Sequence, residues 1–242
     1  MRTVINLQNI SVRYRLPEER IGTFKEYAIR LLKRKLAYKS FQALQNVSLE
    51  IKKGETFGII GRNGAGKSTL LKVISRVLIP TGGRVQIRGM VSPLLELGAG
   101  FHPELTGREN IFLNGTLLGH SHDDIEERLG KIVEFSELGN FIEAPIRTYS
   151  TGMVARLGFA VATAWKPDIL ILDEVLSVGD EAFQQKCKNK IDEFRTRDVT
   201  TILVTHAMQT MASLCTRAVW LDQGQIRATG EVQDVISAYR GG

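Results

Sequence analysis

The chain has 242 residues, of which 43% are hydrophobic and 24% charged, and its formal net charge is +6. That composition is typical of a soluble globular protein, and a disordered chain is not expected. The charge is small enough for an ordinary solvated surface, so by itself it selects neither a nucleic acid, a phosphate-bearing ligand nor an anionic membrane as partner.

The two cysteines, Cys187 and Cys215, form no CxxC pair. A disulfide framework and a zinc cluster are therefore not expected, and a reducing cytoplasm is the predicted compartment. No stretch approaches the roughly 20 apolar residues that a transmembrane helix needs. The first ten residues also lack the apolar core of a secretory signal, so any role at a membrane is expected to depend on a partner protein.

In the first third of the chain, alternating apolar residues predict a strand at Val4–Tyr14, and strand patterns return at Ala43–Ile51 and Thr56–Ile60. Between the first two strands, Thr23–Lys39 places its apolar residues at helical spacing, which predicts an amphipathic helix. A glycine-rich sequence follows Ile60, after which Leu70–Val77 again has helical spacing.

The rest of the chain passes from short strands through a helical block to alternating strands and helices. The middle section is predicted to contain strands at Arg84–Ile87 and Met90–Leu95 and helices at Arg108–Leu118, Asp123–Phe135 and Gly152–Ala164. The last section is predicted to contain strands at Ile169–Leu172, Thr201–Thr205 and Ala218–Asp222 and helices at Ala182–Arg195, Gln209–Leu214 and Val232–Tyr239. This order predicts an α/β core with helices on both faces of a mostly parallel sheet.

The segment Gly61–Thr69, GRNGAGKST, matches the phosphate-binding pattern G-x4-G-K-[ST] between a predicted strand and a predicted helix. Its glycines allow backbone N–H groups to curl around a β-phosphate, and the helix N-terminus adds its positive end. Lys67 is expected to reach the β- and γ-phosphates, and the Ser68 hydroxyl is expected to ligate Mg²⁺. ATP and Mg²⁺ are thus the predicted ligands, and the predicted nucleotide contacts in this segment are Gly61, Asn63, Gly64, Ala65, Gly66, Lys67, Ser68 and Thr69.

Two carboxylates, Asp173 and Glu174, follow the apolar run Ile169–Leu172 at the strand end that faces the ligand crevice in α/β sheets. Asp173 is expected to hold Mg²⁺ through water, and Glu174 to polarise the water that attacks the γ-phosphate. His206 ends another buried strand and is placed to contact the γ-phosphate, although a lone histidine is ordinarily structural. Lys67, Glu174 and His206 are the predicted catalytic residues.

The order of these motifs resembles that of the ATPase subunits of ABC transporters, and the likeness covers nearly the whole chain. Tyr149–Met153 stands where that family has its LSGGQ signature, of which Ser150 and Gly152 are kept. These two residues precede a predicted helix, so a hydroxyl, backbone N–H groups and the helix dipole form a second anion site. The resemblance implies that this site grips the γ-phosphate bound to a second copy, in a head-to-tail homodimer.

The same resemblance implies the fold, a P-loop NTPase (RecA-like) core with an inserted helical subdomain and an N-terminal antiparallel β subdomain. All three are expected to form one ABC ATPase domain over residues 1–242. The expected bounds are 1–55 for the β subdomain with its inserted helix 23–39, 56–97 and 166–242 for the core, and 98–165 for the helical subdomain.

Further roles follow from the resemblance alone. Tyr14 resembles the aromatic residue that stacks on adenine, a contact worth about 1–3 kcal/mol; a strand-end core tyrosine is the alternative. Ser177–Asp180 stands where the family has a loop that communicates across the dimer. The family's glutamine after the strand ending near Leu95 is missing, and Glu96 is the nearest substitute as a Mg²⁺ ligand, although it lacks an amide donor.

Two longer strings, Leu95–Asn110 and Asp173–Cys187, resemble exporters of lipid-linked O-antigen, capsule or teichoic-acid chains. We therefore expect a subunit that lies peripherally on the cytoplasmic face of the inner membrane and drives O-antigen export. Transmembrane permease subunits and, through them, lipid-linked polysaccharide are the expected partners, and nucleic acid is not. The alternatives are an ABC ATPase for another cargo, a soluble ABC ATPase without a transport role, and a nucleotide switch without turnover, which Glu174 and His206 argue against.

The predicted helix 23–39 carries six basic residues and one acidic residue, Glu26. Three roles remain open for it: contact with anionic lipid headgroups at about 1 kcal/mol per basic residue, contact with the pyrophosphate of a lipid-linked substrate, or packing on its own domain. Some exporters of this branch carry a carbohydrate-binding domain after the ATPase. Since the chain ends soon after Tyr239, we expect a system without that domain or a shortened chain.

Overall fold

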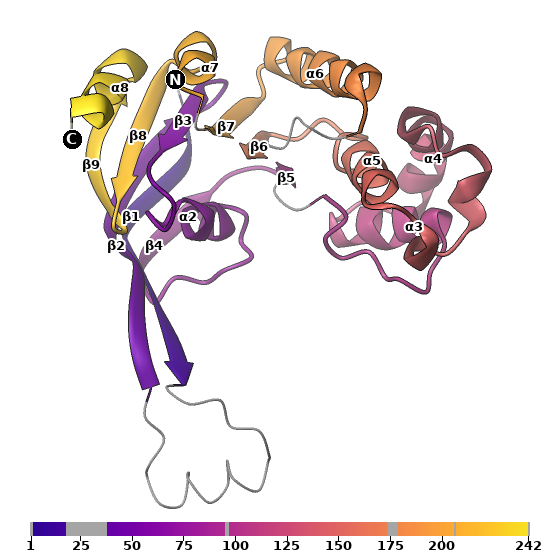
Figure 1. Cartoon of the computed structure of the whole chain (residues 1–242), viewed down its shortest axis with the longest axis horizontal. Coiled ribbons are helices and arrows are strands. Elements are labelled where there is room, and N and C mark those ends of the chain that lie inside the picture. The colour runs from indigo at the N-terminus through magenta and orange to yellow at the C-terminus, as the bar shows by residue number, and fades with distance from the viewer. Residues whose placement is uncertain (1, 18–37, 95–96, 174–178, 206, 242) are drawn as a thin grey trace, which may run out of the picture.

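The computed structural model describes residues 2–17, 38–94, 97–173, 179–205 and 207–241 (Figure 1). Most of the predicted helix Thr23–Lys39 falls outside these residues. Its last two residues, Tyr38 and Lys39, belong to a strand, so the predicted end of that helix is wrong. Among the described helices, none combines the length and the apolar character that crossing a bilayer requires.

An antiparallel sheet is formed by β1 (Thr3–Pro17), β2 (Tyr38–Lys52) and β4 (Gly82–Ile87), in the order β2-β1-β4. Its apolar side chains alternate toward the core, and a register shift between Leu7 and Ile10 lets both of these residues stay buried. The predicted β subdomain, 1–55, is therefore too short, because β4 pairs with β1 from outside that range.

The second sheet has the order β5-β6-β7-β3-β8-β9, and among these described strands only β9 is antiparallel to its neighbour. Its strands are β3 (Thr56–Ile60), β5 (Val91–Leu94), β6 (Ile169–Asp173), β7 (Thr200–Val204), β8 (Arg217–Asp222) and β9 (Gln225–Glu231). The sequence analysis missed β9, which joins β8 through Gln223 and Gly224. Both residues have positive φ, 46° and 75°, as in a tight two-residue hairpin turn.

Both faces of the second sheet are covered, which explains why its strands are nearly continuous apolar runs. Ile169 and Ile171 point into the core shared with the antiparallel sheet and α2 (Lys67–Ile74). Leu170 and Leu172 point to the opposite face, into the core that also contains side chains of the helices there. These helices are α6 (Glu181–Thr196), α7 (Met208–Leu214) and α8 (Val232–Gly241).

A separate helical lobe contains α3 (Gly107–Leu117), α4 (His122–Ser136) and α5 (Thr151–Ala162), and it stands apart from the two sheets in Figure 1. It has its own hydrophobic core, with Ile111, Ile125 and Leu157 fully buried. Capping boxes begin α3 and α4, and two 3-10 turns, Gly139–Glu143 and Ile146–Thr148, precede α5. The lobe is thus an independently packed insertion between β5 and β6.

Candidate functional site

The segment Gly61–Thr69 forms a cradle between β3 and α2. Its shape depends on glycine: a Cβ at Gly61 would lie 2.3 Å from the Leu221 carbonyl oxygen, and one at Gly66 would lie 2.7 Å from the Ala43 carbonyl oxygen. Gly66 also has φ 105° as the N-cap of α2, a conformation that favours glycine. These contacts show that the loop packs tightly against β2 and β8.

Lys67 spans the cradle. Its Nζ donates to the carbonyl oxygens of Gly61 at 2.6 Å and Arg62 at 3.1 Å. The N-terminus of α2 has no side-chain cap within the described residues, and no acidic residue lies in its first turn. Backbone N–H groups, a helix N-terminus and an ammonium group therefore converge on one place, which suits phosphate oxygens.

An open cavity of about 350 Å³ lies over this cradle. Val204 of β7 lines it together with the loop, and Val204 is the register partner of Asp173 at the end of β6. The backbone of Asp173 therefore lies one strand away from the cavity wall. Ser68 lines the cavity as well, so a hydroxyl of the kind that ligates a nucleotide-bound Mg²⁺ is present in its wall.

Four of the predicted site residues lie wholly or partly outside the described part of the chain. Glu96, Glu174 and His206 lie outside the described residues, as does the side chain of Asp173. In the rest of the chain, no group of three or more His, Cys, Asp or Glu side chains could hold a metal ion. The predicted Mg²⁺ ligation and catalytic roles of these residues stay predictions.

The structure adds an aromatic residue that the sequence analysis missed. Phe41 is 53% exposed and lines the cavity over the cradle. Tyr14, the predicted adenine-stacking residue, is the register partner of Phe41 and packs partly buried against the core. Cross-strand partners share one face of a sheet, so Tyr14 and Phe41 are two neighbouring candidates for adenine contact. Alternation along β2 could have indicated Phe41 from the sequence.

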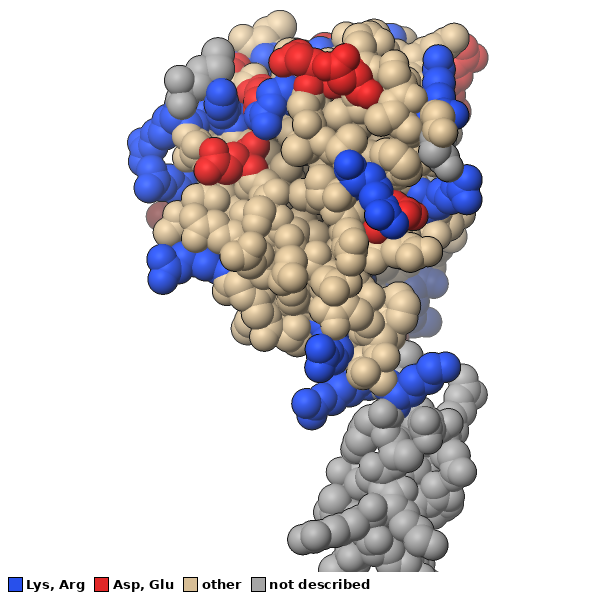
Figure 2. Space-filling model, turned by 90° about the vertical axis from the view of Figure 1, so that its left-hand side faces the viewer, with Lys and Arg blue, Asp and Glu red and all other residues tan. Residues whose placement is uncertain are grey.

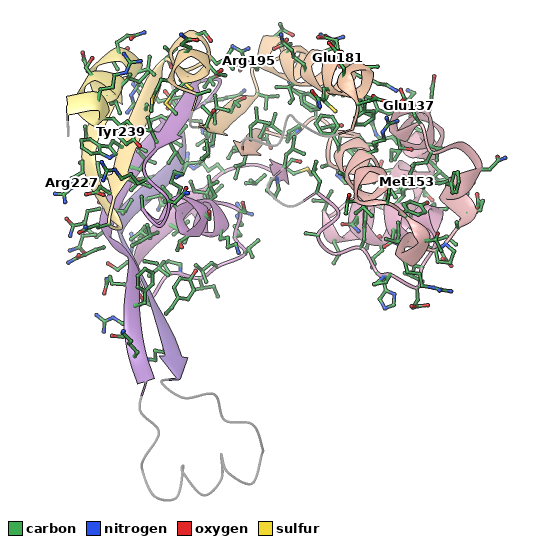
Figure 3. The ribbon with its side chains drawn as sticks, in the orientation of Figure 1. Glu137, Met153, Glu181, Arg195, Arg227 and Tyr239 are labelled. Atoms are coloured by element: carbon green, nitrogen blue, oxygen red, sulfur yellow. The ribbon has the colours of Figure 1, made fainter. Side chains whose placement is uncertain are left out.

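Ser150 and Gly152 stand at the beginning of α5 in the helical lobe. Ser150 is the N-cap, and its Oγ accepts a hydrogen bond from the backbone N–H of Met153 at 3.2 Å. Both Figure 1 and Figure 3, in which Met153 is labelled, place this helix in a different lobe from α2. The predicted second anion site is therefore exposed and is not part of the cradle of its own chain.

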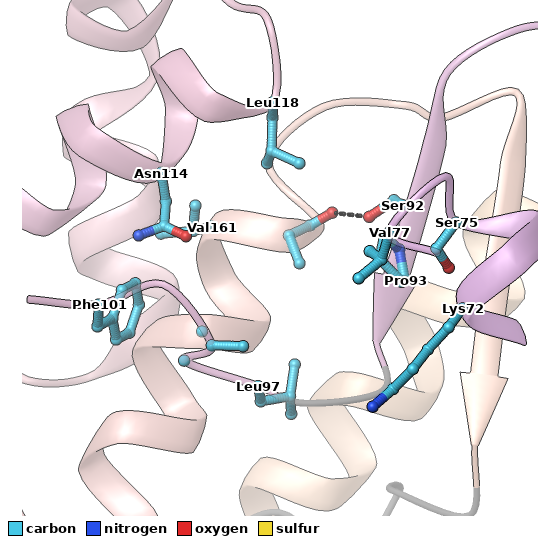
Figure 4. Close-up of a pocket in the computed structure, with 14 residues that line it drawn as sticks. Lys72, Ser75, Val77, Ser92, Pro93, Leu97, Phe101, Asn114, Leu118 and Val161 are labelled. Carbon is cyan, nitrogen blue, oxygen red and sulfur yellow. Dashed lines mark hydrogen bonds between the residues drawn. The ribbon is translucent and has the colours of Figure 1, made fainter. Parts of the chain in front are cut away.

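A largely apolar groove of about 190 Å³ separates α2 and β5 from the helical lobe (Figure 4). Its walls include Val77, Pro93, Leu97, Phe101 and Leu118, and the Ser92 hydroxyl closes its floor by donating to the Ala162 carbonyl oxygen at 2.8 Å. Val77 is 72% exposed. Exposed apolar surface gathered in one groove is typical of a docking site.

Basic side chains gather at the narrow end of the described surface, where β1 and β2 project as a two-stranded ribbon (Figure 2). Arg13 and Arg15 are exposed on the outer face of β1. With Gln42, they help line a polar pocket whose described lining residues include no carboxylate. This end of the molecule is therefore suited to an anionic surface.

Comparison with known proteins gives consistent results. The ABC transporter family model matches residues 44–177. An O-antigen export system ATP-binding protein, RfbB of Klebsiella pneumoniae, is 45% identical over 99% of this chain and 98% of its own length. RfbB of Myxococcus xanthus is 49% identical over 90% of this chain, and the teichoic acids export ATP-binding protein TagH of Bacillus cereus is 39% identical over 99%. This chain spans only 51% and 43% of those two relatives.

Solved structures show the same fold at lower sequence identity. The ATP-binding cassette MJ0796, a dimer in a post-hydrolysis state with ADP and phosphate, superposes with a TM-score of 0.71 at 23% identity, covering 94% of this chain and 98% of that chain. An ATP-binding subunit of an ABC transporter has a TM-score of 0.73 at 22% identity, covering 98% of this chain and 93% of that chain. The predicted α/β fold class is confirmed by these likenesses.

Proposed function

Since this chain belongs to the ABC transporter family, we propose that it is the ATP-hydrolysing subunit of an exporter of lipid-linked surface polysaccharide, with O-antigen the first expected cargo. The observation that carries the cargo is the match along nearly the whole length of both chains to an O-antigen export protein. The cradle at Gly61–Thr69 supports the ATPase activity, and this support does not depend on any relative.

We assign the cradle to the phosphates of ATP. Lys67 would exchange its bonds to the Gly61 and Arg62 carbonyl oxygens for phosphate oxygens, so its charge is already held where negative charge develops. Ser68 and Asp173 would hold Mg²⁺, which neutralises phosphate charge during transfer. Glu174 would orient the attacking water, and Tyr14 or Phe41 would support the adenine.

Two copies would form each complete site. The N-terminus of α5 lies in a different lobe from the cradle, so Ser150 and Gly152 would close over the nucleotide of a second copy. A head-to-tail pair satisfies both cradles at once because the two-fold operation repeats each contact. The dimeric cassette with the same fold supports this arrangement.

The apolar groove would receive the permease subunits. It lies between α2 and β5 on one side and the helical lobe on the other, so a change in their relative position would move a segment docked there. The basic end of the β1–β2 ribbon suits anionic lipid headgroups, which supports the proposal that the chain lies peripherally on the cytoplasmic face of the inner membrane.

Glu174→Gln in the native host tests this function. We expect ATP turnover to fall about 100-fold or more, because the water loses its base. Lipid-linked polysaccharide should then accumulate on the cytoplasmic side while the surface polymer disappears. Glu127→Gln, an exposed change on α4, serves as the matched control and should leave both unchanged. Normal surface polysaccharide in a host with a stably produced but inactive Glu174→Gln protein would show that the cargo assignment is wrong.

A further inference from the structure

A polar pocket of about 540 Å³ opens on the outer face of the antiparallel sheet, and none of its described lining residues lines the cavity over the cradle. Arg13 and Gln42 are register partners in its wall. Each adjoins one of the two aromatic residues of the cradle side, Tyr14 and Phe41, so their side chains point to the opposite face. The described lining consists of Ser11, Arg13, Arg15, Gln42, Gln45, Asn46 and Thr81.

A β-bulge brings two amide side chains to this pocket. The register of β1 against β2 shifts between Ile10 and Val12. The one residue between them, Ser11, therefore lies opposite two residues of β2, Gln45 and Asn46. Neighbouring side chains of a regular strand point to opposite faces, whereas a bulge re-aims one of them. Asn46 has φ 50°, and both amide side chains line the pocket.

The oxygens of these two amides are already engaged as acceptors. Gln45 Oε1 accepts a hydrogen bond from Gln225 Nε2 at 2.7 Å. Asn46 Oδ1 accepts one from the Ser11 hydroxyl at 3.3 Å, and that hydroxyl also accepts from the Asn46 backbone N–H at 3.1 Å. The side-chain N–H groups of Gln45 and Asn46 donate to no other described residue. The two amides therefore offer donors to the pocket.

Two arginines add positive charge to these donors. Arg13 bonds to Gln42 Oε1 through its Nε at 3.3 Å, so its two terminal nitrogens have no partner among the described residues. Arg15 is exposed, and neither arginine forms an ion pair with a carboxylate in the described part of the chain. A ligand that matches this pocket brings negative charge and several acceptor oxygens. A phosphate group has both.

We propose that this pocket binds a phosphate group, presented by an anionic lipid headgroup. The arginines and amides are exposed, so each contact is weak in water, and a free ion should bind no more tightly than about millimolar. A membrane surface presents many phosphate groups at once, and this raises their local concentration at the basic end of the ribbon (Figure 2). The site itself goes beyond the ATPase activity, whereas the lipid as its source rests on the proposed membrane location.

Asn46→Asp in the full-length protein tests the pocket. Aspartate keeps the acceptor for the Ser11 hydroxyl and tolerates the positive φ, but it replaces the N–H donors with a negatively charged oxygen. Flotation with phosphatidylcholine vesicles that contain phosphatidylglycerol measures binding. We expect the variant to bind these vesicles at least about tenfold more weakly than the wild type. Vesicles of phosphatidylcholine alone should bind neither protein.

Asn9→Asp is the matched control. Asn9 stands on the same sheet with φ 52°, and its Oδ1 accepts from the Ser48 hydroxyl at 3.2 Å, but it does not line the pocket. The same change of charge there should leave vesicle binding within about twofold of the wild type, because surface charges are screened by salt.

Arg15→Gln and Arg84→Gln form a second pair that does not disturb the fold. Arg15 lines the pocket without a side-chain hydrogen bond or ion pair to a described residue. Arg84 is an exposed arginine of β4 in the same sheet and does not line the pocket. Arg15→Gln should weaken vesicle binding about fivefold or more, and Arg84→Gln should weaken it less.

Calorimetric titration with inorganic pyrophosphate separates a lipid from a soluble phosphate compound. The cradle contributes the same binding step in every variant, so a second, weaker step that Asn46→Asp lacks reports the pocket. Vesicle binding that Asn46→Asp weakens and Asn9→Asp keeps supports the proposal with or without this step. The step without any effect of Asn46→Asp on vesicle binding would overturn the lipid as the source.

The pocket itself is overturned if neither probe separates Asn46→Asp from the wild type, or if Asn9→Asp weakens binding equally. Equal binding to vesicles with and without phosphatidylglycerol would overturn recognition of an anionic headgroup. Turnover by Glu174→Gln at the wild-type rate would instead contradict the proposed function and leave the pocket unaffected.

Discussion

Replacing Lys67 with methionine is expected to lower ATP turnover by at least about 100-fold, because one preorganised cation is lost where phosphate charge develops. The fold should survive, because methionine has nearly the same length and the bonds from Lys67 to Gly61 and Arg62 reach carbonyl oxygens of a partly exposed loop. Release of phosphate by the purified protein at saturating ATP measures the effect, and the melting temperature checks that the fold is intact.

Lys188→Met provides the comparison for that variant. Lys188 is an exposed lysine on α6, far along the chain from the cradle. Its replacement therefore removes the same charge without removing a phosphate contact. Its turnover should equal that of the wild type. If Lys67→Met kept more than about half of the wild-type rate, the cradle could not be the place where phosphate charge is stabilised.

Replacing Gly66 with alanine is expected to abolish ATP binding and to lower the free energy of unfolding by about 1–3 kcal/mol. The residue has φ 105°, and the new Cβ would lie 2.7 Å from the Ala43 carbonyl oxygen and 2.9 Å from Leu44 Cδ2. The clash of the new Cβ can be relieved only if the loop moves away from β2, and that movement opens the cradle. Denaturant unfolding and titration with a fluorescent ATP analogue measure the two effects.

Gly64→Ala and Gly130→Ala separate the effect of the steric clash from the effect of backbone strain. Gly64 has φ 80° but nothing within 4 Å of a Cβ, so alanine there adds backbone strain without a clash. Gly130, inside α4, also has open space and lacks the positive φ, so alanine should raise the stability by roughly 0.5–1 kcal/mol. Equal stability of Gly66→Ala and the wild type would contradict the tight packing of the cradle against β2.

The parts of the fold that the sequence predicts well are those whose signals are local. The strand Thr56–Ile60 has the predicted bounds because a short apolar run is framed by glycines. The cradle follows from the loop sequence itself. The hairpin strand β9 was missed because it is an edge strand whose exposed positions alternate with half-buried ones, so few large apolar residues mark it. The turn at Gln223 and Gly224 was the available signal.

Features that depend on distant pairing could not be predicted in the same way. The pairing of β4 with β1 depends on the order of the strands in the sheet, and no local sequence pattern specifies that order. The partners of Arg156 lie 19 and 24 residues away, on two other elements. Alternation along β2 could have indicated Phe41, but its place beside Tyr14 depends on the register between β1 and β2. The motif spacing predicted the nucleotide site, whereas the ion pairs of Arg156 with Glu137 and Asp180 could be found only in the tertiary structure.

Cross-linking of two singly modified chains tests most directly whether each chain completes the other's cradle. One population carries Arg62→Cys in the cradle, and the other carries Thr151→Cys at the start of α5; both positions are exposed. The native Cys187 and Cys215 should not react with a short bis-maleimide, because burial raises the pKa of each thiol to about 12. Both populations also carry Glu174→Gln, so that ATP is bound but not consumed.

The proposed arrangement predicts a covalent heterodimer when the two populations are mixed with Mg²⁺ and ATP. Little product should form without nucleotide or when either population is treated alone. Equal cross-linking with and without ATP, or none in the mixture while the nucleotide analogue still binds, would contradict a site built by two chains.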